Sequence, residues 1–214
     1  MTEKKLEELT RIKLPQPLRR DKVLELIIEL GDRNLIDKDT ANCLYAGLIS
    51  DTRDFQNANV RKKDFVIASE LIGLGANPSM VSDLLYNNNS VERLALTGYA
   101  LSEKLVVLPK YKTAYIALSN EELTLFGAQT GDTEDLVDYA LSIYGIRLSV
   151  LLFNRTDTIK FSFRSVGDFS VNELAKKHFD GGGHKNRAGG TSNTSLDEAI
   201  SKFLSVLPEY RKEL

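Results

Sequence analysis

The feature that most constrains this chain is a concentration of glycine near its C-terminal end, in residues 179–190. Five of these twelve residues are glycine, of fourteen in the whole sequence. Because glycine has no Cβ, its backbone can adopt positive φ angles and can approach a ligand closely. The N–H groups of Gly181, Gly182 and Gly183 can converge on an anion, and His184 adds an imidazole donor beside them. The pattern therefore favours a phosphate-binding loop over a flexible surface turn.

A second group that suits phosphate is Arg164-Ser165, at the end of a predicted strand and shortly before the glycines. An arginine guanidinium is a planar fork of donors that matches two phosphate oxygens, and a serine hydroxyl can donate a further hydrogen bond. An Arg-Ser pair by itself is usually a solvated strand end. Its place before a helix and the glycine-rich segment makes both residues candidates for substrate binding.

The composition is that of an ordinary soluble globular protein, with 42% hydrophobic and 27% charged residues. The formal net charge of −2 gives no overall basic field, so any contact with nucleic acid must be a local patch. Cys43 is the only cysteine, which excludes an internal disulfide and a cysteine-based zinc site. The charged start of the chain is unlike a signal peptide, and no apolar run is long enough to span a bilayer. We therefore expect a cytoplasmic protein with no membrane partner.

Helical patterns dominate the first part of the chain. The spacing of apolar residues predicts helices over 22–31, 39–49 and 65–73, and Asn77-Pro78 is a start signal for one more. The polar run at 87–90 breaks the pattern and indicates a domain boundary after residue 88.

The second part alternates strands with helices, which argues for a compact α/β domain. Serine followed three residues later by glutamate marks a capping box at Ser119, Ser170 and Ser195. Apolar alternation predicts a hairpin of two strands just before Arg164-Ser165. The predicted elements are helix 91–104, strands 105–108 and 113–118, helices 119–126 and 133–142, strands 147–153 and 158–163, and two helices that begin near 170 and 195.

The glycine segment resembles a known signature. Residues 181–184 followed by Ala188-Gly189 resemble the GGGHxxAAG motif of the substrate-binding domain in the DHH phosphoesterase superfamily. Arg187 stands where the family has the first alanine.

A second resemblance lies in residues 44–55, which are similar to the family's fourth motif, a Thr-Asp-Thr-Gly-x-Phe pattern preceded by glycine. Asp51 matches the aspartate of that motif, and Gly47 and Phe55 match their positions. Ser50 replaces a threonine and Arg53 replaces a glycine, which raises the question of whether arginine adopts the backbone shape of that glycine.

The resemblance implies three parts: 1–88, the mostly helical C-terminal part of a DHH catalytic domain; 89–104, a linker helix; and 105–214, the α/β substrate-binding domain. It implies a hydrolase that uses two manganese ions, with Asp51 as a catalytic residue and metal ligand. The implied substrate-binding residues are Arg164, Ser165, Gly181, Gly182, Gly183 and His184. Residues 131–137 look most like the branch that hydrolyses short oligoribonucleotides and 3′-phosphoadenosine 5′-phosphate (PAP). Exopolyphosphatase-related and cyclic-dinucleotide phosphodiesterase branches share both motifs and stay open as alternatives.

The Asp-His-His run that names the family is absent from the sequence, whose two histidines, His178 and His184, lie in the C-terminal domain. A two-metal site needs several ligands around ions about 3.5–4 Å apart, and Asp51 alone does not supply them. One hypothesis is a phosphoesterase completed by an N-terminal segment or by a partner such as a second copy in a homodimer. The other hypotheses are a non-catalytic nucleotide-binding module and a remnant without stable function.

Overall fold

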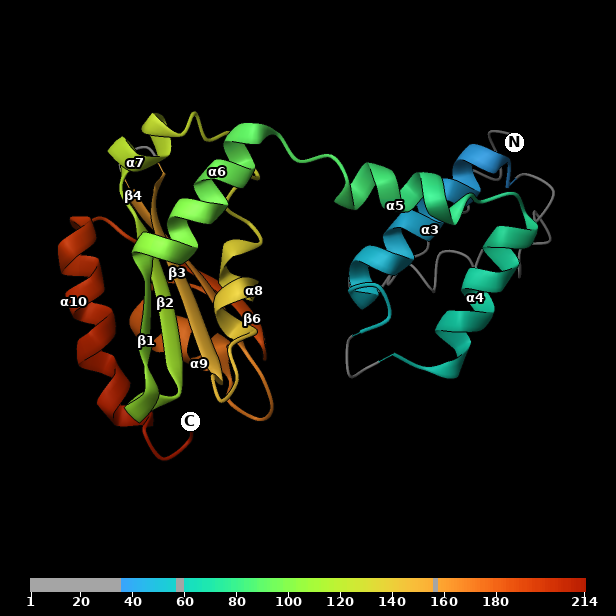
Figure 1. Cartoon of the computed structure of the whole chain (residues 1–214). Helices are drawn as coiled ribbons and strands as arrows, with labels where there is room; N and C mark the ends of the chain where they lie inside the picture. The colour runs from blue at the N-terminus through green and yellow to red at the C-terminus, as the bar shows by residue number, and fades with distance from the viewer. Residues whose placement is uncertain (1–35, 57–59, 156–157) are drawn as a thin grey trace, which may run out of the picture. The chain divides into compact units, whose positions relative to one another are not determined.

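The computed structural model describes residues 36–56, 60–155 and 158–214, so the helix predicted over 22–31 lies outside the described residues. The chain divides into two compact units, Met1–Asn88 and Asn89–Leu214 (Figure 1). Within the described residues, none of the helices has the length and apolar character needed to cross a bilayer.

The described part of the first unit is helical. It contains α3 (Lys38–Thr52), α4 (Lys62–Gly73) and α5 (Pro78–Tyr86). The predicted start signal of α5 is confirmed, because the Asn77 side chain accepts a hydrogen bond from the Met80 N–H at 3.1 Å and Pro78 occupies the first turn. The three helices share one small core, made of Ala41, Leu48, Ile49, Ile67, Leu71 and Val81 among others.

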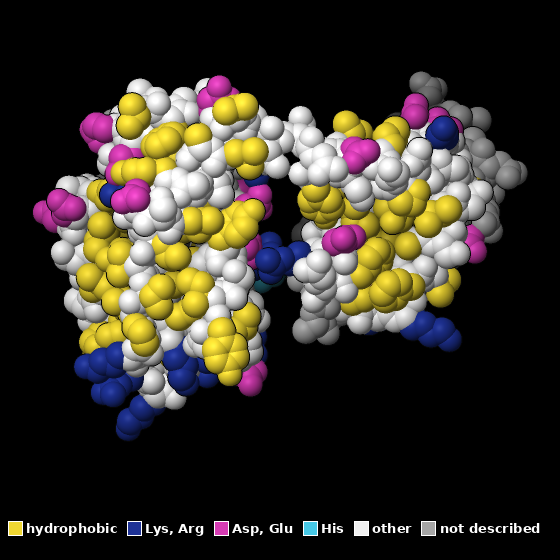
Figure 2. All heavy atoms as spheres, in the orientation of Figure 1, with side chains coloured by type: hydrophobic (Ala, Val, Ile, Leu, Met, Phe, Trp, Pro, Cys, Tyr) yellow, Lys and Arg dark blue, Asp and Glu magenta, His cyan; other side chains and the backbone are white. Residues whose placement is uncertain are grey.

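Large apolar side chains also gather on the surface of α4 and α5 (Figure 2). Phe65 is 54% exposed and Leu84 is 64% exposed, and Val66, Ile72 and Leu85 are exposed on the same two helices. Exposed apolar patches of this kind are typical of an interaction surface, so we infer that another protein segment covers this face of α4 and α5.

The end of α3 has an unusual backbone that places Asp51. Asp51 is exposed in the last turn, whereas Thr52 is buried and its hydroxyl donates to the Leu48 carbonyl at 2.8 Å. Arg53, Asp54 and Phe55 follow with φ angles of 51°, 53° and 61°, all in the left-handed region. Arg53 therefore has a left-handed backbone, a conformation that glycine adopts freely and that costs arginine roughly 1–2 kcal/mol for the clash of its Cβ.

Replacing this arginine by the family's glycine is expected to stabilise α3. For Arg53→Gly we expect a gain of about 0.5–1 kcal/mol, because the left-handed strain is removed and part of the gain is lost to the larger entropy of unfolded glycine. Hydrogen exchange of the α3 amides measures this local stability.

The matched control is Ser50→Gly, an exposed position within the same helix, where glycine should cost about 0.5–1 kcal/mol. Equal destabilisation by both substitutions would contradict the assignment of strain to Arg53.

The second unit is built on one mixed sheet with the strand order β1-β2-β3-β4-β6-β5. Only β2 and β3 pair in parallel; the other neighbours are antiparallel. The strands are β1 (Leu105–Leu108), β2 (Thr113–Leu118), β3 (Leu148–Arg155), β4 (Thr158–Ser165), β5 (Gly182–His184) and β6 (Arg187–Ser192). The helices are α6 (Val91–Tyr99), α7 (Asn120–Leu125), α8 (Leu136–Leu141), α9 (Val171–His178) and α10 (Leu196–Val206), with the π-helical turn η2 (Ala100–Lys104) and the 3₁₀ turns η3 (Pro109–Tyr111) and η4 (Leu207–Tyr210).

The two faces of this sheet are covered differently. On one face, α9 and α10 enclose a core that includes Phe161, Phe163, Phe179 and Phe203 (Figure 1). On the other face, α6, η2, α7 and α8 cover a core centred on β2 and β3. Side chains of β4 alternate between half-buried and buried along the whole strand, which fits the period of two for a strand with one face in the core. Its half-buried side chains lie on the second face, where α8 also contacts β4.

Several predicted starts are confirmed in detail. Ser119 and Ser195 both form complete capping boxes with the glutamate three residues on. Ser170 caps α9 by accepting from the Glu173 N–H at 3.3 Å, without the reciprocal bond.

Two expectations differ from the structure. The segment 89–104, predicted as a linker helix, contributes Leu96 and Ala100 to the core of the second unit, where both are fully buried. The glycine segment, predicted as a loop, forms the last two strands of the sheet, β5 and β6.

Candidate functional site

The glycine segment is a hairpin whose backbone packs too closely for a side chain at Gly181, Gly183 and Gly190. A Cβ on Gly181 would lie 2.6 Å from the Gly190 Cα and closer still to the Gly189 carbonyl oxygen. A Cβ on Gly190 would lie 2.6 Å from the Phe179 carbonyl oxygen. Real Cβ atoms do not approach this closely, so these glycines are required by the packing of β5 on β6.

One N–H of the hairpin is already occupied within the protein, because Gly183 donates to the Asn172 side chain of α9 at 2.9 Å. Phe179, just before the hairpin, packs in the core, and its ring lies 4.7 Å from the ring of Phe161 and 5.1 Å from that of Phe163, measured between centroids. The strand ends are thus fixed by backbone contact and by an aromatic cluster, which holds His184 at the edge of the sheet.

Ser165 is buried, and its hydroxyl forms hydrogen bonds with two other described residues, Phe169 and Asn186. It donates to the Phe169 carbonyl at 2.8 Å and accepts from the Asn186 side-chain amide at 2.9 Å. The backbone repeats this link, since the Ser165 N–H donates to the Asn186 carbonyl at 3.1 Å. We therefore assign Ser165 the role of fixing the β5–β6 turn against the end of β4, and its contact with substrate stays a prediction.

Arg164, Arg187 and His184 form a row across three adjacent strands, which we call the Arg–His row. Arg164 of β4 is paired directly with Arg187 of β6, and Arg187 is paired directly with His184 of β5. Directly opposed residues of antiparallel strands have Cβ atoms about 4.5–5.5 Å apart on the same face. The strand register thus gathers three side chains that can all donate hydrogen bonds. Arg187, which replaces the alanine of the family motif, adds a second guanidinium group to them.

One carboxylate faces the two guanidinium groups of this row. Asp138 of α8 places its Oδ2 atom 3.8 Å from Arg164 Nε and its Oδ1 atom 3.7 Å from Arg187 Nη2. Arg164 Nη1 also donates to the Phe163 carbonyl at 3.0 Å, which orients the guanidinium. Asp138 thus brings the two guanidinium groups to one place on this face of the sheet.

Lys185, in the turn beside the row, is engaged elsewhere. Its ammonium lies 2.8 Å from Asp168 Oδ1, and this hydrogen bond lowers the pKa of the Asp168 carboxyl. The other histidine, His178, packs against Tyr210, with its Nε2 atom 2.9 Å from the tyrosine hydroxyl. Burial lowers the pKa of His178, and α9, which carries this histidine, covers the opposite face of the sheet.

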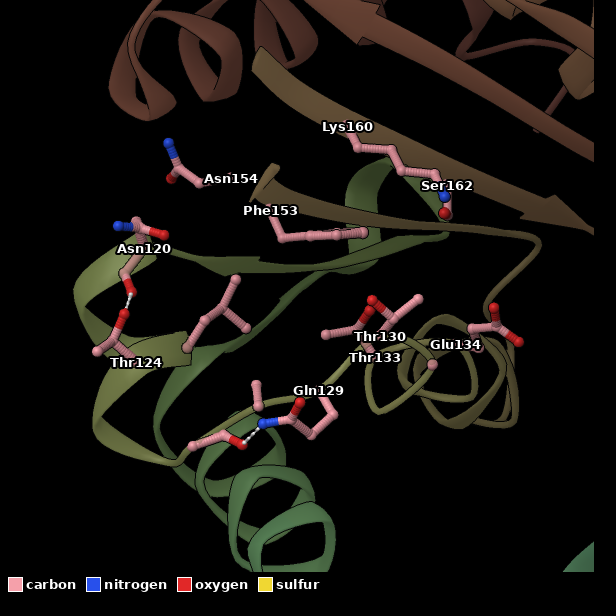
Figure 3. Close-up of a pocket in the computed structure, with 14 residues that line it drawn as sticks. Asn120, Thr124, Gln129, Thr130, Thr133, Glu134, Phe153, Asn154, Lys160 and Ser162 are labelled. Carbon is pink, nitrogen blue, oxygen red and sulfur yellow. Dashed lines mark hydrogen bonds between the residues drawn. The ribbon is translucent and has the colours of Figure 1, made fainter. Parts of the chain in front are cut away.

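The same face of β4 continues away from the row through Ser162 and Lys160, because alternate residues of a strand share a face. Two hollows flank this continuation, and Lys160 lines both. One hollow, of about 420 Å³, lies over the glycines Gly181, Gly182, Gly189 and Gly190. The other, of about 550 Å³, lies between α7, the loop 127–134 and the ends of β3 and β4 (Figure 3).

Asp51, the predicted metal ligand, lies in the first unit at the end of α3. Among residues 36–56, 60–155 and 158–214, no group of three or more His, Cys, Asp or Glu side chains could hold a metal ion. The described residues therefore do not fit a manganese site, and the roles of Asp51 stay predictions.

Comparison with known proteins places this geometry in a family. Residues 111–213 match the DHHA1 domain. The bifunctional oligoribonuclease and PAP phosphatase NrnA of Bacillus subtilis is 32% identical over 173 residues, which cover 81% of this chain and 53% of NrnA. The cyclic-di-AMP phosphodiesterase PdeA of Listeria monocytogenes is 29% identical over 199 residues, covering 88% of this chain and 28% of PdeA. The crystal structure of an exopolyphosphatase-related protein from Bacteroides fragilis has a TM-score of 0.86 and 36% identity, covering 90% of this chain and 56% of that one.

The chain belongs to the DHH superfamily of phosphoesterases. It spans about half the length of the two NrnA proteins that it matches, 53% and 50%. The DHHA1 match contains every predicted substrate-binding residue, from Arg164 to His184, whereas Asp51 lies before it. It also begins after α6 and η2, although that segment is part of the second unit's core.

The DHHA1 hairpin should not tolerate even one added methyl group at its closest contact. For Gly181→Ala we expect the second unit to lose about 3 kcal/mol of stability, because the new Cβ forces the backbones of β5 and β6 apart. Chemical denaturation followed by circular dichroism measures the loss.

Gly98→Ala is the matched control, since nothing lies within 4 Å of its Cβ position and alanine favours the exposed helix α6 by up to about 1 kcal/mol. If Gly181→Ala were as stable as Gly98→Ala, the close packing of the hairpin would be refuted.

Proposed function

We propose that this chain supplies the substrate-binding part of a DHH phosphoesterase that acts on short oligoribonucleotides and PAP. The observation that carries the proposal is the Arg–His row, in which the strand register pairs the half-buried Arg164 with Arg187, and Arg187 with His184. Guanidinium groups match phosphate oxygens in pairs, and neutral or charged imidazole donates a further hydrogen bond. The names of the NrnA relatives support the substrate class.

The glycines have a supporting role in this proposal. Gly181 and Gly190 let the backbones of the hairpin pack closely, and the hollow of about 420 Å³ is lined by Gly181, Gly182, Gly189 and Gly190, which have no side chains to fill it. A phosphate held by the row could then continue into its nucleoside along the face of β4. Ser165 and Asn186 keep the turn in place, and Asp138 keeps the two arginines from swinging into solvent.

Binding of PAP should depend on the fork of Arg164. Arg164→Ala is expected to lose roughly 1.5–3 kcal/mol of binding free energy, the scale of a charge-assisted hydrogen bond, and Arg164→Lys should lose part of it because an ammonium lacks the planar fork. His184→Ala should also weaken binding. Isothermal titration of PAP into each variant measures these losses.

Arg211→Ala is the control for removal of a positive charge, since Arg211 is exposed near the C-terminus. The same titration with cyclic-di-AMP and with polyphosphate tests the alternative branches. Unchanged PAP affinity in both Arg164→Ala and His184→Ala would refute the phosphate site, and a clear preference for cyclic-di-AMP or polyphosphate would reassign the substrate.

Hydrolysis by the 214-residue chain itself should be weak or absent, even with manganese. The reason is the number of ligands in the sequence: no Asp-His-His run accompanies Asp51, and a two-metal site needs several carboxylates and imidazoles. Release of phosphate from PAP, measured with the purified chain and with Asp51→Ala, tests this. Robust turnover that is lost in Asp51→Ala would show instead that the chain is a complete enzyme; equal and negligible rates would support a binding role.

A further inference from the structure

The hollow of about 550 Å³ at the ends of β3 and β4 is a second candidate binding site on the same sheet face. We name it the strand-end pocket and define it by Lys160 and Ser162 of β4, Phe153 of β3, and Asn120, Gln129 and Thr130 around its rim. Its volume lies in the range of pockets that hold nucleotide-sized ligands. None of these residues belongs to a motif in the sequence.

The floor of this pocket is an aromatic ring beside an ammonium. Phe153 and Lys160 are paired directly across β3 and β4, and Lys160 Nζ lies 5.7 Å from the centre of the Phe153 ring. Figure 3 shows Phe153 in the middle of the pocket, with Lys160 and Ser162 on one side and Gln129 and Thr130 on the other. Within the described part of the chain, Lys160 forms no ion pair with a carboxylate. Its charge is therefore available to a ligand.

The rim carries groups that can read the edge of a base. Gln129 donates one amide hydrogen to the Gly127 carbonyl at 3.0 Å, which fixes its orientation and leaves its carbonyl oxygen as an acceptor. Asn120 and Asn154 add two more amides to the lining. Amides present a donor and an acceptor side by side, which matches the edge of a nucleobase, and an aromatic ring offers a stacking surface to any base.

The distance between this pocket and the Arg–His row sets the size of the ligand. Lys160 and Arg164 lie four residues apart on one strand, so their Cα atoms are about 13 Å apart. The single phosphate of a mononucleotide cannot bind at both places, whereas a dinucleotide has a terminal phosphate for the row and a second nucleotide for the pocket. Ser162 lies between them on the same face and keeps the path polar.

We propose that the strand-end pocket binds the second nucleotide of a 5′-phosphorylated oligonucleotide, with its base against Phe153 and its phosphate on Lys160. This inference rests on the proposed function, because it takes the Arg–His row as the site of the terminal phosphate. Under this proposal, residues of β4 decide how much more tightly the chain binds a dinucleotide than a mononucleotide.

The test compares 5′-AMP with 5′-phosphorylated diadenylate, titrated at one fixed salt concentration because phosphate contacts weaken with salt. The wild-type chain is expected to bind the diadenylate about tenfold more tightly than AMP, which corresponds to one charge-assisted contact. Lys160→Ala should remove most of this ratio. Phe153→Leu, which keeps an apolar side chain but removes the ring, should reduce the ratio as well.

Lys212→Ala is the charge-matched control, because this exposed lysine lines neither hollow. Nuclear magnetic resonance of the side-chain amides of Asn120, Gln129 and Asn154 gives a readout that does not depend on any variant's stability. Their signals should shift with diadenylate and not with AMP.

The outcomes separate the two proposals. If the wild-type chain binds AMP but gains nothing from the second nucleotide, the pocket assignment is overturned while the phosphate site stands. The same holds if Lys160→Ala and Lys212→Ala have equal effects and the amide signals do not move. If the wild-type chain binds neither ligand, the proposed function itself fails and the pocket assignment fails with it.

Discussion

The close packing of backbone on backbone between β5 and β6 is the contact on which the rest of the candidate site depends. Gly181 and Gly190 allow it, because their missing Cβ atoms leave room for the Gly190 Cα and the Phe179 carbonyl. Once the strands meet, hydrogen bonding fixes their register, and the register alone decides that His184 lies opposite Arg187. A one-residue slip would turn the imidazole to the other face of the sheet.

A second lock fixes this hairpin relative to β4. The buried Ser165 hydroxyl and the Asn186 amide join the end of β4 to the turn of the hairpin, with the Phe169 carbonyl as a further acceptor. Ser165, Phe169 and the more distant Asn186 thus share one small polar network. Such a network rigidifies the site because every member has a partner and breaking one bond leaves a buried polar group unsatisfied.

Much of the fold can be predicted from local patterns, and the exceptions have a physical cause. Serine caps, the Asn77-Pro78 start and the β3–β4 hairpin are local signals, and the structure confirms them. The strands β5 and β6 were not predictable from propensity, because glycine packs no side chain and disfavours strands. Only the tertiary contact with Phe179 and β4 makes them strands, so the same glycines indicate a loop when the sequence is considered alone.

The candidate site was likewise predictable in part: the sequence identifies some of its residues but not how they lie relative to one another. Arg164, His184 and the glycines can be found from motifs, but the motif is silent on which side chains share a face. Arg187 reads as a departure from the family pattern, and only the pairing of β4 with β6 shows that it completes the row. The sequence also does not show that Ser165 is buried and bonded to Phe169; its contact with substrate stays a prediction. The strand-end pocket had no sequence signal, because only the observed register of β3 and β4 pairs Phe153 with Lys160.

The strand β4 joins these observations into one physical argument. Its period of two places Lys160, Ser162 and Arg164 on the exposed face and Ile159, Phe161 and Phe163 in the core. The same alternation therefore positions the aromatic residues that pack under the hairpin and the polar residues on the other face. A change in the register of β4 would move both groups together. The core fixes the spacing of the polar residues at about 6.6 Å per step, two residues at 3.3 Å each. The packing of the aromatic cluster thus also sets the spacing along which an oligonucleotide would lie.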